Sequence, residues 1–348
     1  MFQLRATPTH ATPIYDALSQ TIPYFVPPSL RASLLDGTSP LLSWQPGRTP
    51  FSTGTSVLLA GAGYLAIIFT GQALMQKFKV QAFKLKQPFV LHNFLLSVCS
   101  GLLLACMLEE ILPLWKRNGF YYAICAEQAW TKRMETLYIF NYIFKFWELG
   151  DTVFLVLKKK PLAFLHVYHH SATALLCFSQ LLGKTSVSWV VITLNLFVHV
   201  IMYAYYMLTA LRIPCPWKKA VTSTQILQFV LDLGVIYYAS YNYFVNAYGL
   251  GKTLPNHGKC AAGKEHAVWS GCTILSSYLV LFIAFYQKTY KSKKAAGEAH
   301  TAFAKTAKQA TSLAAEKDMI SGTGGASQPA SVANSDEKKR SSKSSGNA

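Results

Sequence analysis

Seven apolar stretches, each at least 21 residues long, occupy most of the chain between residues 56 and 288. They run over residues 56–76, 89–112, 134–157, 162–182, 187–210, 220–246 and 267–288. About 20 helical residues span the hydrocarbon core of a bilayer, so each stretch is long enough to cross a membrane. Charged residues make up 14% of the chain, against about 25% in ordinary soluble domains. The sequence therefore predicts an all-α membrane protein with seven transmembrane helices.

Lysine and arginine are distributed unevenly among the loops between these stretches. The loops after the first, third, fifth and seventh stretches carry 14 positive residues, whereas the opposite loops together with Arg48 carry 9. Because cytoplasmic loops of membrane proteins are enriched in Lys and Arg, we expect the N-terminus in the lumen and the C-terminus in the cytosol. This placement assigns the net charge of +18 to loops and tail and argues against a nucleic-acid partner.

The two ends of the chain differ in composition from residues 51–290, which hold the predicted seven-helix domain. Residues 1–50 contain several prolines and no apolar signal region, so we expect a largely irregular lumenal segment. Residues 291–348 are rich in Ser, Ala, Gly and Lys, which predicts a disordered, basic cytosolic tail.

Two of the seven cysteines, Cys125 and Cys260, lie in loops that this orientation places in the lumen. Because the lumen is oxidising, we predict a disulfide between them, with two free thiols as the alternative. The other five cysteines lie within or beside the apolar stretches, where a small apolar role is expected.

Polar residues inside the apolar stretches form five clusters. His166, His169 and His170 in HVYHH share one helical face, because they are spaced by three and four residues. The other clusters are Lys145, Glu148, Asp151 and Thr152 in KFWELGDT; Asn195, His199, Met202, Tyr203 and Tyr206 in NLFVHVIMYAYY; Gln225 and Gln228 in TSTQILQF; and His92 with Asn93. Alternating span direction places all five in the cytosolic half of the bilayer. One such cluster is compatible with a structural polar pair, but five at one depth predict a functional chamber.

The predicted chamber is lined by histidine, opens to the cytosol and lies above apolar, aromatic half-spans, which suits a substrate with a charged head and a long hydrocarbon tail. Five intramembrane histidines are too few for a two-iron centre, but they suffice for one zinc ion in a seven-span hydrolase acting on lipid amides. Alternatively, a neutral imidazole attacks a thioester in acyl transfer. A non-enzymatic seven-span receptor is a third interpretation.

Four of these stretches, KFWELGDT, HVYHH, NLFVHVIMYAYY and TSTQILQF, resemble in order and spacing the signature motifs of the ELO family of very-long-chain fatty acid elongases. The patterns are K-x-x-E-x-x-D-T, H-x-x-H-H, H-x-x-M-Y-x-Y-Y and T-x-x-Q-x-x-Q, and flanking stretches such as LVLKKKPLAFLH are similar to the fungal branch. The resemblance covers roughly residues 51–290. It implies six helices around a narrow acyl tunnel closed at the lumenal side, with a seventh helix outside. It also implies a location in the endoplasmic reticulum membrane.

The implied activity is the condensing step of microsomal fatty acid elongation. A long-chain acyl-CoA and malonyl-CoA give a 3-oxoacyl-CoA two carbons longer, with release of CO2 and CoA. No permanently bound cofactor and no metal are expected. The expected partners are the two CoA substrates, membrane lipids and the reductase, dehydratase and enoyl reductase of the cycle, and a homo-oligomer is compatible with the sequence. By branch resemblance, the acyl chains are saturated or monounsaturated and feed sphingolipids.

For the mechanism we predict that His169 attacks the acyl thioester; direct base-assisted decarboxylation without a covalent adduct is the alternative. The residues expected to orient the ring, polarise the carbonyl and stabilise the enolate are His166, His170, Asn195 and His199, with Glu148 and Asp151 fixing the geometry. The residues expected to meet CoA are Lys145, Lys158, Lys159, Lys160, Gln225 and Gln228, whereas Tyr203 and Tyr206 supply hydroxyls or packing. Tunnel depth is expected to depend on residues 237–244 and 268–274.

Overall fold

The computed structural model describes residues 10–25, 39–261 and 263–291, and all regular structure in these ranges is helical. The helices are α1 (Pro13–Phe25), α3 (Gly54–Lys77), α4 (Lys86–Asn118), α5 (Phe120–Cys125), η1 (Glu127–Ala129), α6 (Lys132–Glu148), α7 (Gly150–Leu157), α8 (Phe164–Gly183), α9 (Ser188–Ala210), α10 (Lys218–Ala247), η2 (Leu250–Lys252), α11 (Glu265–Tyr286) and η3 (Gln287–Lys291). The tail predicted over residues 291–348 lies outside the described residues except for Lys291.

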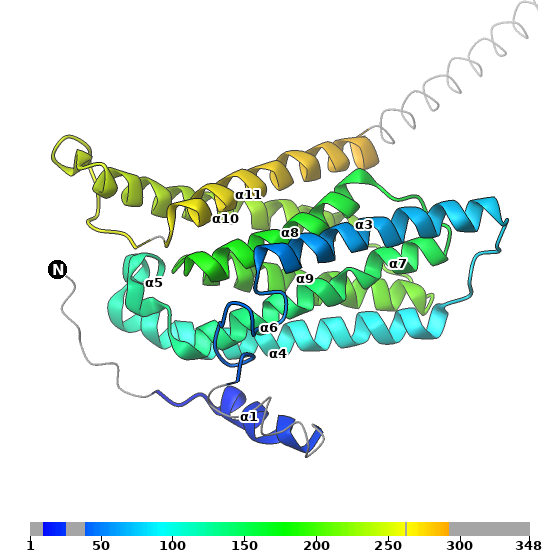
Figure 1. The fold of residues 1–348 in the computed structure, drawn as a ribbon, viewed down its shortest axis with the longest axis horizontal. Helices are drawn as coiled ribbons and strands as arrows, with labels where there is room; N and C mark the ends of the chain where they lie inside the picture. The colour runs from blue at the N-terminus through cyan, green and yellow to red at the C-terminus, as the bar shows by residue number, and fades with distance from the viewer. Residues whose placement is uncertain (1–9, 26–38, 262, 292–348) are drawn as a thin grey trace, which may run out of the picture. The chain divides into compact units, whose positions relative to one another are not determined.

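Each of the seven predicted apolar stretches coincides with one long helix or, for the third, with the α6–α7 pair. Figure 1 shows these helices running back and forth along a common axis. Five of them, namely α3, α4, α9, α10 and the segment Glu265–Tyr290, are long and apolar enough to cross a membrane. Of the others, α6 and α7 are only 17 and 8 residues long, and α8 carries the H-x-x-H-H motif, whose polar side chains lower its hydropathy.

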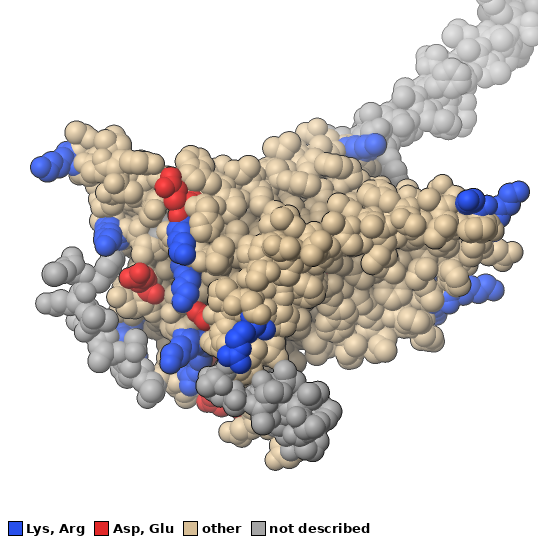
Figure 2. Space-filling view, in the orientation of Figure 1, with Lys and Arg blue, Asp and Glu red and all other residues tan. Residues whose placement is uncertain are grey.

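The bundle has two chemically different ends. The lysine end holds the turns at residues 78–85, 158–163 and 211–217, and the disulfide end holds α5, η1 and the segment 248–261. On the face drawn in Figure 2, Lys and Arg gather over both ends, Asp and Glu only over the disulfide end, and a belt without charged side chains lies between. An uncharged belt is what a surface in contact with lipid tails requires.

The continuous helix predicted over residues 134–157 is interrupted at Leu149, where α6 ends and α7 begins. The Leu149 amide donates to the Phe146 carbonyl and the Thr152 amide to the Leu149 carbonyl, both over 3.2 Å, so the backbone tightens to i→i+3 bonding here. A side chain at Gly150 would place its Cβ 3.3 Å from the ring of His92. The glycine therefore allows α4 to approach the junction closely.

At the disulfide end, Cys125 and Cys260 form a disulfide, and the Ala261 amide donates to the Cys125 carbonyl over 2.7 Å.

Within residues 1–50, which were expected to be largely irregular, α1 is helical. The amides of Ile14 and Tyr15 at its start donate to the carboxylate of Glu109 on α4. A carboxylate at this position satisfies amides that have no partner within their own helix.

The first long helix, α3, lies outside the rest of the bundle and packs against α7 and α8. Its buried residues are Val57, Tyr64, Ile68 and Met75, and many of its other side chains are exposed. This pattern fits a helix that contacts the protein along one stripe and lipid along the rest.

Candidate active site

A cavity of about 400 Å³ lies in the half of the bundle that includes the lysine end. All six predicted catalytic residues line it, together with five of the eight residues predicted to bind substrate. These are His166, His169, His170, Asp151, Asn195 and His199, with Glu148, Gln225, Gln228, Tyr203 and Tyr206. They meet because they lie at the end of α6, at the start of α7, in the first turns of α8, along α9 from its middle toward its end, and in the first half of α10. We call this space the polar cavity.

One hydrogen-bonded chain in the wall runs from Lys145 to His199. The Lys145 Nζ atom lies 2.8 Å from Glu148 Oε1 and 2.9 Å from Asn195 Oδ1. Lys145 and Glu148 are both at most 5% exposed, so their charges meet away from bulk water. Lys145 does not line the cavity itself; it holds two residues that do.

The same series of hydrogen bonds orients the imidazole of His199. Because Lys145 donates to the Asn195 oxygen, the Asn195 amide nitrogen faces His199 Nε2, at 3.2 Å, and donates to it. A neutral His199 then carries its proton on Nδ1, which lies 3.2 Å from Glu148 Oε1. This assignment of the tautomer follows from the hydrogen-bond network.

The carboxylate of Asp151 is bound by two groups, neither of them from the HVYHH motif. His92 Nε2 lies 2.7 Å from Asp151 Oδ1, and the Tyr203 hydroxyl donates to Asp151 Oδ2 over 2.9 Å. The sequence prediction noted His92 as polar but gave it no role. The signal was present, because His92 is the one ionisable residue in the first turns of an otherwise apolar stretch.

The three histidines of α8 have different environments. His166 Nε2 lies 3.0 Å from the Thr152 hydroxyl, and its ring lies 4.3 Å from that of His170 between centroids. Among the described residues, neither ring nitrogen of His169 has a hydrogen-bond partner. The His169 ring instead contacts Tyr278 at 4.6 Å and Phe282 at 5.7 Å between centroids. No other side chain in the described part of the chain therefore occupies the ring nitrogens of His169.

The two glutamines of α10 lie in the cavity wall. Gln225 Nε2 contacts the Met202 sulfur at 3.2 Å, and Gln228 Nε2 donates to the carboxyl group of Asp232 over 3.2 Å. Asp232 is fully buried, and the sequence prediction did not single it out. Its carboxyl group fixes the amide of Gln228 and leaves the amide oxygen of Gln228 for another donor.

Lys158 and Lys159 do not line the polar cavity but lie in the turn after α7, at the lysine end. The Lys158 Nζ atom lies 3.4 Å from the centre of the Phe89 ring, and Phe89 does line the cavity. Partial burial, and then the charge of Lys160, lower the pKa of the Lys158 ammonium from its ordinary value. A cation is thus held beside the cavity wall.

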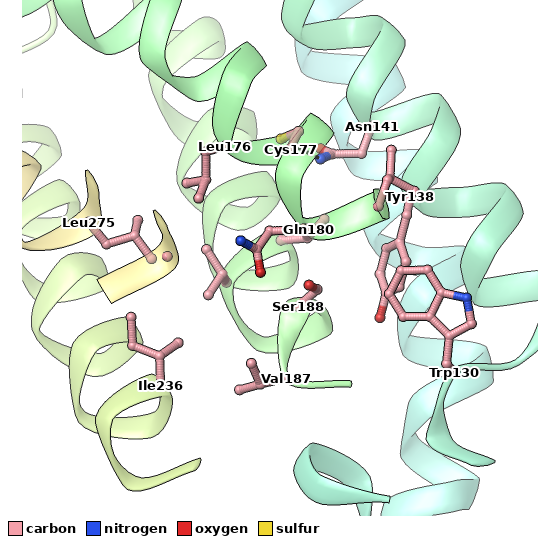
Figure 3. A pocket seen from close by; sticks show the side chains of 14 residues that line it. Trp130, Tyr138, Asn141, Leu176, Cys177, Gln180, Val187, Ser188, Ile236 and Leu275 are labelled. Carbon is pink, nitrogen blue, oxygen red and sulfur yellow. Dashed lines mark hydrogen bonds between the residues drawn. The ribbon is translucent and has the colours of Figure 1, made fainter. Parts of the chain in front are cut away.

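A second, smaller cavity of about 60 Å³ lies toward the disulfide end (Figure 3). Most of its lining is apolar, and Leu176, Ile236 and Leu275 approach it from three different helices. Gly271 also lines it, whereas no residue from 237 to 244 does. Helical rise places Leu176 about 10 Å beyond His169 along α8. We call this space the apolar cavity.

No group of three or more His, Cys, Asp or Glu side chains is arranged to hold a metal ion in the part of the chain that the structure describes. The polar cavity presents several imidazoles, of which His166 and His199 have hydroxyl and amide partners and His169 has none in the described part of the chain. Such an arrangement can supply a nucleophile and hydrogen-bond donors beside a buried cation.

Comparison with known proteins identifies the family. The sequence profile of the ELO (GNS1/SUR4) family matches residues 49–298. The chain belongs to the ELO family of fatty acid elongases. It is therefore a multi-pass membrane enzyme of the 3-oxoacyl-CoA synthase family, which condenses acyl-CoA with malonyl-CoA. This confirms the resemblance given by the four motifs, and it favours the elongase over the hydrolase and receptor alternatives.

Individual relatives agree with this assignment. A Schizosaccharomyces pombe protein named "Putative fatty acid elongase 1" is 48% identical over 277 residues, which cover 78% of this chain and 81% of the relative. Two Dictyostelium discoideum proteins, "Fatty acid elongase sre1" and "Fatty acid elongase A", are 33% and 35% identical and cover 88% and 91% of their own lengths. Those alignments include 72% and 74% of this chain.

Proposed function

We propose that this elongase works through two half-reactions with an acyl group carried on His169. The observation that supports this most directly is the imidazole of His169, which lines the polar cavity and has no hydrogen-bond partner for its ring nitrogens among the described residues. Its neighbours His166 and His199 have polar partners. His170, like His169, has none among the described residues, but its ring packs against His166 and His169, whereas the His169 ring also contacts Tyr278 and Phe282.

In the first half-reaction, a ring nitrogen of His169 attacks the thioester carbon of a long-chain acyl-CoA. The carbon–sulfur bond breaks, CoA leaves as the thiolate, and the acyl group is bound to the imidazole. Hydrogen-bond donors in the cavity wall, among them His166 and the amide of Asn195, stabilise the negative charge that develops on the carbonyl oxygen. The surrounding aromatic rings of Tyr278 and Phe282 exclude water and protect the acyl-imidazole.

In the second half-reaction, malonyl-CoA binds and loses CO2, and its enolate carbon attacks the acyl carbon. The new carbon–carbon bond forms as the carbon–nitrogen bond breaks, which returns neutral His169 and releases 3-oxoacyl-CoA. Glu148, whose Oε1 atom lies 3.2 Å from Nδ1 of His199, holds this imidazole in position next to the developing enolate. Asp151, fixed by His92 and Tyr203, orients the cavity wall and takes no part in bond making.

We further propose that the acyl chain extends from the polar cavity into the apolar cavity, inside a tunnel formed by six of seven transmembrane helices and closed at the disulfide end. The apolar lining of the second cavity supports this, because transfer of a hydrocarbon chain from water into apolar surroundings is favourable. The chains proposed are saturated and monounsaturated ones that feed sphingolipid synthesis. At the lysine end, Lys158, Lys159 and Lys160 bind CoA phosphates, and Gln225 and Gln228 bind the pantetheine amides.

We place the enzyme in the endoplasmic reticulum membrane, with residues 1–50 and the disulfide end lumenal and the lysine end and residues 291–348 cytosolic. A disulfide at one end and lysine-rich turns at the other support this orientation. In microsomes, an Asn-x-Ser/Thr site inserted at residues 250–258 is expected to be glycosylated, and one inserted at residues 211–217 is not. The proposed partners are the other three enzymes of the elongation cycle and a second copy of the chain.

The covalent scheme is tested by incubating the purified enzyme with acyl-CoA alone and digesting it rapidly. The peptide that contains His166–His170 is expected to gain the mass of one acyl group and to lose it when malonyl-CoA is added. An unmodified peptide from an enzyme that still condenses both substrates rejects the covalent scheme and favours direct decarboxylation. His169→Ala supplies the control, since it should abolish the mass gain.

A further inference from the structure

The first long helix, α3, provides one polar contact that reaches the wall of the polar cavity. The Tyr64 hydroxyl lies 2.8 Å from the Thr152 hydroxyl, which in turn lies 3.0 Å from His166 Nε2. Tyr64 is 5% exposed and Thr152 is fully buried. His166 lines the cavity, so the three side chains form a relay from outside the catalytic helices to the reaction site.

The proton positions in this relay follow from the number of partners available. Among the described residues, the Tyr64 hydroxyl has no hydrogen-bond partner other than Thr152, so its proton points to the Thr152 oxygen. The Thr152 proton then points to its one other partner, His166 Nε2. The opposite direction, from His166 to Thr152 to Tyr64, would leave the phenol proton buried without an acceptor, which is unfavourable.

The direction of the relay defines the state of His166. Because Nε2 accepts a hydrogen bond, the neutral ring carries its proton on Nδ1. We propose that Tyr64 is a positioning residue, which acts through Thr152 to hold His166 as a neutral Nδ1–H donor for the oxyanion of the reacting acyl group. This inference rests on the proposed function in one respect only, namely that His166 acts next to an acyl group bound in the polar cavity.

Packing explains why α3 can hold this contact in register. Tyr64 belongs to a small cluster with Ile68, Met75, Val156 and Val167, which joins α3 to α7 and α8. Phenylalanine would fill the same space, so the packing does not require the hydroxyl group. The hydroxyl is the part of Tyr64 that the relay uses.

The test compares full-length variants in a condensation assay with labelled malonyl-CoA. Tyr64→Phe is expected to lower kcat about tenfold, the loss of roughly one hydrogen bond in the transition state, with KM for acyl-CoA unchanged within about twofold. Thr152→Val is expected to be at least as slow, and Thr152→Ser, which keeps the hydroxyl, to approach the native rate. Tyr64→Phe is expected to have no further effect in the Thr152→Val background.

Tyr142→Phe is the matched control. Tyr142 is fully buried and its hydroxyl donates to the Phe51 carbonyl over 2.9 Å, outside the polar cavity. This variant should lose stability without losing kcat per folded molecule. A native kcat for folded Tyr64→Phe, or equal rates for Thr152→Ser and Thr152→Val, overturns the relay. The comparison of Thr152→Ser with Thr152→Val still tests the relay if Tyr64→Phe fails to fold.

Failure of the proposed function gives a different result. If the wild-type chain condenses its substrates without a mass gain on the His166–His170 peptide, the acyl-histidine scheme fails, while the kcat effects of Tyr64 and Thr152 still report on the relay. If the scheme holds and the Tyr64 variant is fully active, only the relay is wrong.

Discussion

The polar and apolar cavities share α6, α8, α9, α10 and α11, yet their polar groups are held in different ways. Around the polar cavity, Asp151 and Asn195 bond to side chains from other helices, and Glu148 bonds to Lys145 one turn earlier in α6. Around the apolar cavity, Gln180 bonds to the Ala267 carbonyl and accepts from Thr185, so both ends of its amide are occupied. The first arrangement leaves imidazoles available for chemistry, and the second leaves mainly hydrocarbon for contact with a chain.

The difference has an energetic side. A buried ion pair such as Lys145–Glu148 contributes little net stability, because taking both charges out of water offsets their attraction. An apolar wall between membrane helices is stabilised by close packing, because lipid tails are as apolar as the side chains. We therefore expect the apolar half of the bundle to contribute more of the folding free energy than the polar half.

The largest difference between the two cavities is expected when the proposed nucleophile is removed. His169→Ala is expected to lower kcat for condensation by at least about 10³-fold, because removing a group that forms the covalent intermediate leaves only binding and electrostatic effects. The measurement is product formation per folded molecule at saturating acyl-CoA.

The matched control is His266→Ala, which alters an exposed histidine at the disulfide end and should leave the rate unchanged. Retention of more than a tenth of the native rate by His169→Ala would show that the polar cavity does not use this histidine as a nucleophile.

The second prediction concerns the buried ion pair. Glu148→Gln removes the negative charge and leaves Lys145 without a counter-charge in a site where it is 3% exposed. The free energy of unfolding is expected to fall by about 3–5 kcal/mol. Thermal unfolding of the detergent-solubilised protein measures this change.

The pair Lys145→Met with Glu148→Gln separates charge from packing. The double variant should be more stable than Glu148→Gln alone, because no unpaired charge is then buried. Equal or lower stability of the double variant would contradict the view that the two charges are retained as a pair.

The third prediction tests the disulfide end. Cys125→Ser is expected to lower the free energy of unfolding by about 2–5 kcal/mol, since the disulfide closes a long loop. Cys272→Ser removes a thiol that forms no disulfide and is the control. The kcat of folded Cys125→Ser should be native, because the disulfide lies at the opposite end from the polar cavity. A loss of kcat in folded protein would mean that the two ends are coupled.

These regions also differ in how far the sequence could predict them. The positions of His166, His169, His199 and Gln228 around one cavity followed from helical spacing and alternating direction, because both are properties of the chain itself. The partners of these residues did not follow. The contact of His92 with Asp151 depends on the close approach of α4 at Gly150, and the contact of Tyr64 with Thr152 depends on where α3 packs.

The apolar cavity was predicted least well, for a related reason. Residues 237–244 and 268–274 were expected to set the depth of the tunnel. Of these, Gly271 lines the apolar cavity, and the rest of the lining comes from Ile236, Leu275 and side chains of or near α6, α8 and α9. Apolar residues in a membrane helix look alike whether they face lipid or the interior. Their direction depends on helix rotation in the bundle, which the local pattern does not fix.

The smallest expected effect is on chain length. Gly271 lines the apolar cavity, and a Cβ at this position would lie 3.6 Å from the Gln180 amide, so a side chain there enters the cavity. Gly271→Leu should exclude the last methylenes of the longest acyl chain. At about 0.8 kcal/mol for each buried methylene, the loss of two lowers kcat/KM for that acyl-CoA by about tenfold, while shorter acyl-CoAs react at the native rate.

Gly234→Leu is the matched control, because Gly234 is an exposed glycine of α10 with no atom within 4 Å of its Cβ position. Assays with acyl-CoAs of graded length distinguish the outcomes. A shift toward shorter products with Gly271→Leu but not with Gly234→Leu supports the apolar cavity as the site of the chain terminus. A uniform loss over all lengths would instead reflect overpacking of the bundle, and the two cavities would then not belong to one acyl tunnel.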